Sequence, residues 1–171
     1  HPFISVTLFL GIFSLHAEKK TKPNIVFFLV DDLGWSDVAC FGSSFYETPH
    51  IDYLAKEGVK FTSGYAACHV CSPTRASILT GKYPATMNLT EWLNGRSDRP
   101  YQALLNPDKA MALDPKEITL AEVLKKEGYA TALFGKWHLG RDTSPTGHGF
   151  DLHVPHSVNS NLGRRGFYNP K

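Results

Sequence analysis

Three short clusters of polar residues in this sequence have types and spacings that could support catalysis. The first is the pair Asp31 and Asp32, which directly follows the apolar run NIVFFLV at residues 24–30. Adjacent carboxylates repel each other, and one site tolerates both most easily around a hard divalent cation that prefers oxygen ligands. Gly34 permits the turn that would direct both side chains to one ion. A solvated acidic loop is the alternative.

The second cluster begins at Cys71, which stands directly before Ser72, Pro73 and a helical pattern. We expect its side chain at the N-terminus of a helix, where the helix dipole favours anions. Arg75 lies one turn further on the same face, and its guanidinium is a planar fork suited to tetrahedral oxyanions. A zinc half-site, a redox CxxC pair with Cys68, or two small core residues remain open. Zinc is weakly supported because no second CxxC or spaced His pair follows.

The third cluster is the pair Lys136 and His138 within GKWHLG, residues 135–140. In an extended segment these two side chains project to the same side, whereas Trp137 faces the other way. Taken alone, this pair could instead be two solvent-exposed surface residues without a catalytic role. Together the three clusters supply metal carboxylates, an anion-binding helix end, and Arg, Lys and His. Hydrolysis of a sulfate or phosphate ester requires this combination.

The elements that would position these clusters follow an α/β order. The run at 24–30 is typical of a strand buried on both faces of a parallel sheet. Helices are predicted at 48–58, at 72–81 with Ser72 as N-cap, and at 115–129; an extended segment is predicted at 59–67 and a strand at 130–135. This order favours an α/β fold with a mostly parallel sheet flanked by helices, and the clusters fall at element ends, where such sheets build their sites.

Two stretches show little regular pattern. Residues 82–115 are rich in Pro, Asn, Asp and Arg, and we expect a long surface excursion there. Residues 141–171 carry many Gly, Pro, Asn and Ser, and no element is predicted in them. Because such a tail rarely ends a domain, we expect the chain to stop within the domain and the sheet to be incomplete at the C-terminus.

Four segments of the sequence resemble the sulfatase family of the alkaline phosphatase superfamily. CSPTRASILTG (71–81) and GYATALFGKWHLG (128–140) are similar to its two signatures, and PNIVFFLVDDLGWSDVACFG and ETPHIDYLAKEGVKFTSGYA to its opening segments. The resemblance runs from about Pro23 to Asp151. It implies an alkaline-phosphatase-like fold, with residues 23–171 forming the N-terminal part of the catalytic domain.

The resemblance also implies a modified nucleophile and a metal. Cys71 would be oxidised to formylglycine by a maturation enzyme that recognises Pro73 and Arg75. One hydroxyl of the hydrated aldehyde would attack sulfur, and the other would help to eliminate sulfate. One calcium ion would be bound by Asp31, Asp32 and the modified residue 71.

Further roles follow from the same resemblance. Arg75 would stabilise the modified side chain, Lys136 would bind sulfate, and His138 would bind the diol and assist elimination. The remaining calcium ligands of the family, an Asp-Asn pair, and a further substrate-binding His and Lys lie downstream of residue 171, so this fragment alone is expected to be inactive. His50 stands where the family usually has Asn.

The N-terminal segment indicates export. FISVTLFLGIFSL, residues 3–15, has the length of a signal-peptide h-region and is short for a membrane span, so residues 1–17 are predicted to be a signal peptide whose start is truncated. A buried helix or membrane anchor is the alternative. We expect a periplasmic or extracellular protein, or a lysosomal or secretory one in a eukaryote, without stable membrane insertion. An oxidising compartment would permit a disulfide, with Cys40 and Cys68 as a possible pair.

The predicted function is hydrolysis of aryl or carbohydrate sulfate esters, with a sulfated small molecule or glycan as partner. A phosphatase or phosphonate monoester hydrolase of the same superfamily and a non-catalytic fragment are the alternatives. The net charge of +2 gives no reason to expect a nucleic-acid partner. Residues 82–115 are a candidate specificity segment, and Trp35, Trp92 and Trp137 are expected to pack in the fold rather than to stack on sugars.

Overall fold

The computed structural model describes residues 22–155, so the predicted leader at residues 1–17 lies outside the described residues. The chain divides into two units, one up to Val30 and one from Asp31. The described residues of the first unit form no helix or strand, and the strand predicted at 24–30 is therefore wrong. A strand exists only where a neighbour supplies hydrogen-bond partners, and the described part of this unit offers no segment to pair with.

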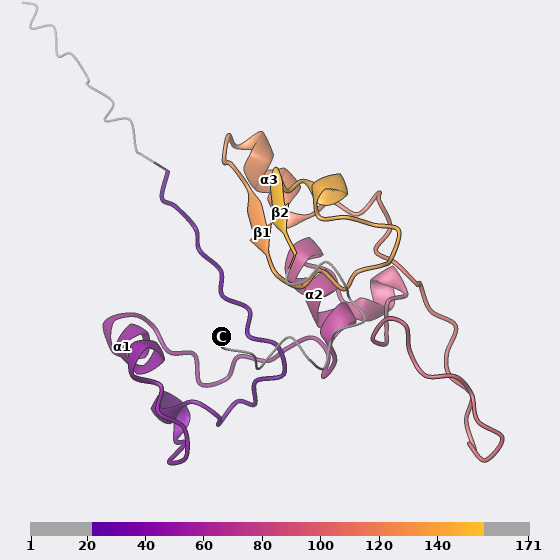
Figure 1. Cartoon of the computed structure of the whole chain (residues 1–171), viewed down its shortest axis with the longest axis horizontal. Coiled ribbons are helices and arrows are strands. Elements are labelled where there is room, and N and C mark those ends of the chain that lie inside the picture. The colour runs from indigo at the N-terminus through magenta and orange to yellow at the C-terminus, as the bar shows by residue number, and fades with distance from the viewer. Residues whose placement is uncertain (1–21, 156–171) are drawn as a thin grey trace, which may run out of the picture. The chain divides into compact units, whose positions relative to one another are not determined.

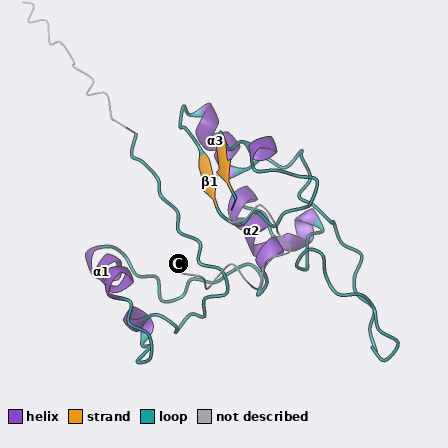
Figure 2. Ribbon diagram, viewed as in Figure 1, coloured by secondary structure: helices purple, strands orange, loops and turns teal. Residues whose placement is uncertain are grey.

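The second unit contains the helices and strands that Figure 1 labels, together with three short 3₁₀ helices. In chain order they are η1 (Ala39–Phe41), α1 (Pro49–Glu57), α2 (Cys71–Thr80), η2 (Pro84–Met87), α3 (Leu120–Lys126), β1 (Ala132–Phe134), η3 (Thr146–His148) and β2 (Leu152–Val154). Loops connect them and make up most of the chain (Figure 2). Residues 59–67 form no strand, contrary to the extended segment predicted there.

Helix α1 forms where the sequence predicts it. Pro49 occupies its first position and Gly58 follows its last residue. Thr48 is the N-cap, but its hydroxyl does not cap the helix. It accepts a hydrogen bond from the Ala39 N–H (2.9 Å) and donates one to the Asp52 carboxylate (3.0 Å). Thr48 therefore ties η1 to α1.

Helix α2 begins two residues earlier than predicted. Val70 is the N-cap and Cys71 is the first helical residue, so the predicted cap at Ser72 is wrong. The Ser72 hydroxyl is fully buried and accepts a hydrogen bond from the Leu93 N–H at 3.1 Å, a partner far along the chain that no local pattern reveals. The helix ends as predicted at Gly81, whose φ of 70° is in the left-handed region that glycine adopts readily.

Helix α3 is shorter than the predicted helix at 115–129. It starts at a capping box: the Thr119 hydroxyl accepts a hydrogen bond from the Glu122 N–H (3.3 Å), and the Glu122 carboxylate accepts one from the Thr119 N–H (2.7 Å). Before it, the Asp114 carboxylate accepts a hydrogen bond from the Lys116 N–H (2.9 Å) and holds a turn. These side chains bond the local backbone, so the helix cannot extend further towards the N-terminus.

Strands β1 and β2 pair in parallel, with Ala132 opposite Leu152 and Phe134 opposite Val154. Strand β1 lies within the predicted strand at 130–135, whereas β2 lies in the stretch 141–171, where no element was predicted. A three-residue strand with a histidine at its centre is too short to show periodicity. The parallel pair and its accompanying helices confirm the α/β class.

A small hydrophobic core is built by Ala76, Leu89, Leu113, Trp137 and Leu139. Leu89 and Leu113 come from the stretch 82–115, which was predicted to be a surface excursion and is therefore only partly one. A backbone hydrogen bond from the Leu113 N–H to the Leu139 carbonyl (2.9 Å) ties this stretch to the segment that follows β1. Single leucines in irregular chain carry no periodic signal, so sequence patterns could not identify them as buried.

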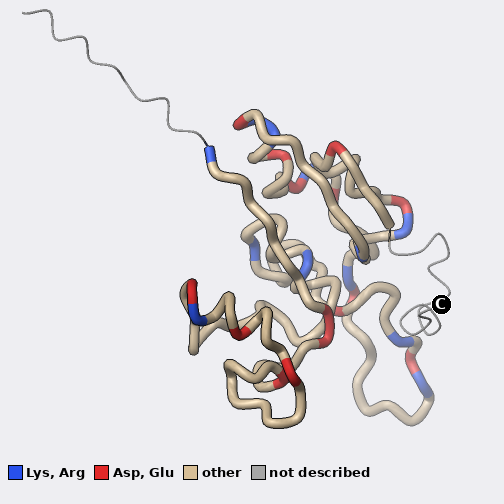
Figure 3. The backbone as a smooth tube through the Cα atoms, turned by 60° about the vertical axis from the view of Figure 1, so that its left-hand side comes forward, with Lys and Arg blue, Asp and Glu red and all other residues tan. Residues whose placement is uncertain are grey.

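Lys and Arg and Asp and Glu occur along the whole described chain, on both helices and loops (Figure 3). Between residues 22 and 155, no helix is both long and apolar enough to cross a lipid bilayer.

Candidate active site

The three polar clusters converge in the second unit, although they are far apart in the sequence. One ligand atom each from Asp31, Asp32 and Cys71 lies within 4.8 Å of the others, which is close enough for all three to hold one metal ion. Asp32 has a φ of 57°, so the chain turns at the acidic pair as the prediction required. Aspartate tolerates this left-handed conformation better than most residues.

Asp31 is bound by both basic residues of the site. One carboxylate oxygen lies 2.5 Å from Lys136 Nζ, and the other lies 3.4 Å from Arg75 Nη2. Partial burial acts to raise the pKa of Asp31, but the hydrogen bond and positive charge of Lys136, helped by Arg75, outweigh it and the pKa falls below its usual value. Asp31 is therefore a carboxylate at neutral pH, as a metal ligand must be.

Arg75 is held by two segments, and one of its buried nitrogens has no partner among the described residues. Its Nη1 donates a hydrogen bond to the Lys136 carbonyl at 2.8 Å, and its side chain is only 12% exposed. Its Nε is buried and has no hydrogen-bond partner among the described residues. A buried donor without a partner costs about 1–3 kcal/mol, so the site fits an additional acceptor such as an oxyanion.

The segment 135–140 is not the extended strand that was used to place Lys136 and His138 on one side. Gly135, His138 and Gly140 have φ values of 103°, 57° and 126°, so the chain turns repeatedly. Trp137 faces away from the polar site as predicted, because it is packed in the core and lies 5.4 Å from the ring of His148. The two polar residues therefore reach the site through turns that sequence alternation does not describe.

His138 is a neutral imidazole at pH 7. Burial is the main cause of its lowered pKa; the hydrogen bond to the Leu93 carbonyl opposes that shift, and the charges of Lys136 and Arg75 reinforce it. Its Nε2 is bonded to the Leu93 carbonyl and must donate there, because a carbonyl only accepts. Its buried Nδ1 is then an acceptor without a partner among the described residues, able to take a proton from a neighbouring hydroxyl.

Leu93 connects the two halves of the site, and sequence reasoning missed it. Its N–H donates to Ser72, the neighbour of the proposed nucleophile, and its carbonyl accepts from His138. Only its backbone takes part, so the residue type gives no signal. The hydrogen bond from the Leu93 N–H also gives the buried Ser72 hydroxyl a partner.

All three cysteines have free thiols in the structure. Cys40 and Cys68 are therefore not paired, and neither are Cys68 and Cys71, so the disulfide possibilities left open by the sequence are not realised. Cys71 stands at the first position of α2, whereas the Cys68 sulfur lies near His69, at 3.9 Å from Nδ1. Of the two, only Cys71 belongs to the carboxylate cluster.

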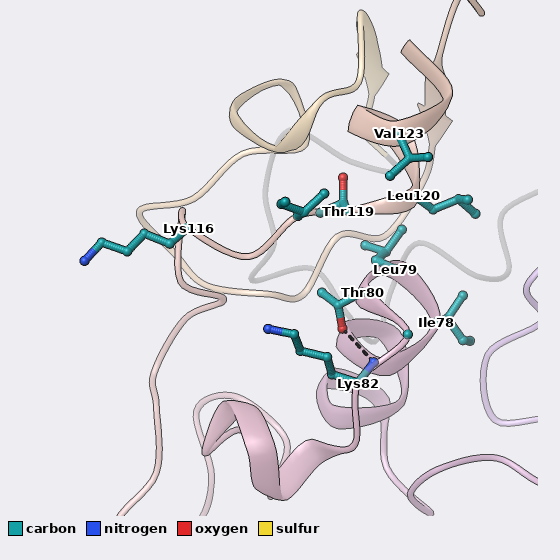
Figure 4. Close-up of a pocket in the computed structure, with 10 residues that line it drawn as sticks. Ile78, Leu79, Thr80, Lys82, Lys116, Thr119, Leu120 and Val123 are labelled. Carbon is teal, nitrogen blue, oxygen red and sulfur yellow. Dashed lines mark hydrogen bonds between the residues drawn. The ribbon is translucent and has the colours of Figure 1, made fainter. Parts of the chain in front are cut away.

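One hollow is remote from this chemistry. It measures about 470 Å³ and lies between the end of α2 and the start of α3, with Ile78, Leu79, Ile118, Leu120 and Val123 giving it an apolar lining (Figure 4). These α2 residues are two turns from Cys71. A second hollow of about 370 Å³ adjoins the N-terminus of α2 and is lined by eight residues: His69, Val70, Thr90, Glu91, Trp92, Arg96, Gln102 and Asn106. We call it the excursion pocket.

Comparison with known proteins identifies the family of the chain. The model of the sulfatase family matches residues 23–170, which is most of the chain and includes all six candidate site residues. The chain belongs to the sulfatase family. Because the sulfatases of known structure that it resembles share the alkaline-phosphatase-like fold, the predicted fold is confirmed.

Individual relatives act on different substrates. Steryl-sulfatase of Mus musculus is 43% identical over 143 residues, which cover 78% of this chain and 22% of that protein. N-acetylgalactosamine-6-O-sulfatase of Bacteroides thetaiotaomicron is 39% identical over 125 residues, covering 73% and 22%. A solved structure from work on glycosaminoglycan metabolism by that bacterium is 36% identical, has a TM-score of 0.65, and is matched over 78% of this chain and 28% of its own. The chain thus spans about a quarter of the length of its relatives.

Two of the three donors in the carboxylate cluster suit calcium. Asp31 and Asp32 supply the hard oxygen ligands that calcium prefers. The sulfur of Cys71 is a soft donor and stands where the oxygen of a hydrated formylglycine would stand. The two carboxylates fit the metal as they are, whereas the third position fits it only after oxidation of the cysteine.

Proposed function

We propose that the full-length protein hydrolyses sulfate esters, using a formylglycine made from Cys71 and one calcium ion. The observation that carries the proposal is the convergence of Asp31, Asp32 and residue 71 within 4.8 Å, with Arg75 and Lys136 on the same carboxylate. When bound, calcium would withdraw charge from a sulfate oxygen and from the modified side chain.

The residues of the chain itself would divide the remaining work. Arg75 and Lys136 place two positive charges beside residue 71, where the negative charge of a sulfate group would gather. The first turn of α2 adds the partial positive charge of a helix N-terminus. His138, neutral and with an unused Nδ1, would accept a proton from a hydroxyl at position 71 during release of sulfate.

The proposal also covers export and maturation of the protein. We propose that it is exported through the apolar segment at residues 3–15, and that a maturation enzyme converts Cys71 before the chain folds. The CH₂–SH group becomes an aldehyde: the sulfur leaves as sulfide, oxygen takes its place, and the two electrons lost pass to an external oxidant used by the maturation enzyme. The modified residue is therefore lighter by about 18 Da. The support for both steps is the sequence and the family to which the chain belongs.

The decisive experiment compares two cysteines that are three positions apart. Purified full-length protein is assayed with an aryl sulfate and the matching aryl phosphate, and the peptide containing residue 71 is weighed by mass spectrometry. We expect sulfate hydrolysis, the loss of about 18 Da at residue 71, no turnover in C71A, and normal turnover in C68A. A preference for the phosphate ester, or an unmodified Cys71 in an active preparation, would contradict the proposal.

A further inference from the structure

Two residues that line the excursion pocket are direct chain neighbours of residues in or bonded to the candidate active site. Val70 in its lining immediately precedes the nucleophile position, Cys71. Trp92, which also lines the pocket, immediately precedes Leu93, whose backbone is bonded to both Ser72 and His138. A group that leaves a sulfate bound at residue 71 would therefore have this hollow beside it.

The pocket has the size and lining of a site for a polar small molecule. Its volume of about 370 Å³ lies within the range of roughly 300–1,000 Å³ that is usual for small-molecule sites. Trp92 supplies a flat apolar surface with a polar edge, and Gln102 and Asn106 supply amides. Amides beside an aromatic ring suit a ligand that carries several hydroxyl groups and one apolar face, whereas a steroid needs an apolar lining throughout.

Arg96 gives the pocket an unbalanced positive charge. The other fully charged residue in the lining, Glu91, is neutralised by an ion pair with Lys109. The Arg96 guanidinium has neither an ion pair nor a hydrogen bond within residues 22–155, although its carbonyl accepts a hydrogen bond from Asn106 at 2.9 Å. The backbone of Arg96 is thus fixed while its planar, permanently charged fork remains available to an anion.

The loop that carries Arg96 is closed by its own hydrogen bonds. Asn106 Nδ2 also donates to the Asp98 carboxylate (2.7 Å), and the same carboxylate accepts from the Asn106 N–H (2.9 Å). Gln102 accepts a hydrogen bond from the Arg99 N–H. Because these bonds order the loop before any ligand binds, less free energy is lost in ordering it on binding.

We propose that the excursion pocket binds the leaving-group side of the substrate, and that Arg96 binds a second anionic group on it, a carboxylate or a further sulfate. The inference rests on the proposed function, because it takes residue 71 as the place of reaction. It selects sulfated carbohydrates with more than one negative charge over sterol sulfates and simple aryl sulfates. Trp92, expected from the sequence to be a packing residue, becomes a candidate surface for the sugar ring.

The test measures substrate preference in the full-length enzyme. Values of kcat/KM are determined for an aryl sulfate, for a monosulfated neutral aminosugar, and for two disaccharides in which the second anion is a uronate carboxylate or a second sulfate. In R96A, the ratio of kcat/KM on a doubly anionic disaccharide to that on the neutral aminosugar should fall about tenfold or more, since a charged hydrogen bond is lost. The disaccharide whose ratio falls further identifies the second anion.

The matched control is R99A, which removes the same charge from the same loop at a residue that does not line the pocket. It should leave the preference as in the wild type, and R96K should restore part of what R96A loses. An unchanged preference in R96A, or an equal loss in R99A, would overturn the inference while leaving the proposed function intact. A wild-type enzyme without activity on any of the four sulfates would instead contradict the proposed function.

Discussion

Substitution of Ser72 by alanine should loosen the active site without touching a catalytic group. The Ser72 hydroxyl is fully buried and accepts the Leu93 N–H at 3.1 Å. The Leu93 carbonyl in turn receives the hydrogen bond of His138. S72A removes the acceptor and leaves the cysteine, proline, threonine and arginine of the signature at positions 71, 73, 74 and 75 unchanged.

The size of the effect follows from the group that loses its partner. A buried backbone N–H left without an acceptor costs about 1–3 kcal/mol. If the free energy of locally opening the segment around Leu93 falls by this amount, the Leu93 amide hydrogen should exchange with solvent about 5–150 times faster. Turnover should fall by about tenfold or more, because the segment also orients His138 and small displacements of catalytic groups have large effects on rate.

Hydrogen exchange followed by mass spectrometry measures this directly in the peptide that contains Leu93. The matched control is S77A on the same helix, because the Ser77 hydroxyl is buried and has no hydrogen-bond partner among the described residues. Its removal should leave exchange at Leu93 unchanged and should not lower thermal stability. Equal exchange in S72A and S77A would refute the reasoning, as would an S72A enzyme with wild-type kcat.

Three further predictions concern the metal, the start of α3 and the beginning of the sheet. Calcium should raise the melting temperature of the full-length protein, and D32N should reduce that rise. Asparagine also adopts the left-handed conformation of Asp32, so this substitution changes the charge but not the backbone. An undiminished rise in D32N would exclude Asp32 as a ligand. T119A should lower the free energy of unfolding, measured by denaturant titration, by about 2–4 kcal/mol. It removes the cap of α3, and it leaves the buried His148 carbonyl, which accepts a hydrogen bond from the Thr119 hydroxyl at 2.7 Å, without a partner. T119S keeps the hydroxyl and should lower the free energy of unfolding far less. The hydrogen bond from Lys125, with further bonds from the Thr131 backbone and side chain, lowers the pKa of Asp151 to about 2, so the stability that its ionisation provides is present above its unfolded pKa of about 3.9 and is lost as the pH falls towards 2. The melting temperature of D151N should therefore depend less on pH in that interval, and an equally steep acid transition in D151N would contradict this.

The candidate site could be predicted closely because its residues are marked by chemistry as well as by pattern. Adjacent carboxylates at Asp31 and Asp32, a cysteine before a helix, and an arginine one turn later are unusual enough to be recognised without coordinates. The structure brings these residues together, and the predicted Lys136 joins them through its ion pair with Asp31. The roles assigned to them remain predictions until the variants are measured.

The fold was predicted less evenly, for physical reasons that differ between elements. Helix α1 and the end of α2 were predicted because proline and glycine act locally on the backbone. The strand predicted at 24–30 and the missed strand β2 depend instead on partners elsewhere in the chain, and hydrogen bonding between segments has no local signature. Burial of Leu89 and Leu113 depends in the same way on distant contacts.

The sequence by itself determined the family, and it predicted the nucleophile position and the groups that could bind a metal and an oxyanion, because residue type and short-range spacing carry that chemistry. Only the tertiary structure decided how these groups are oriented. The hydrogen bonds of Leu93 to Ser72 and His138 join residues that are distant in the chain. The excursion pocket likewise brings Arg96, whose guanidinium has no partner among the described residues, into one lining with Val70. Such contacts depend on where the backbone folds back on itself, which no single segment specifies.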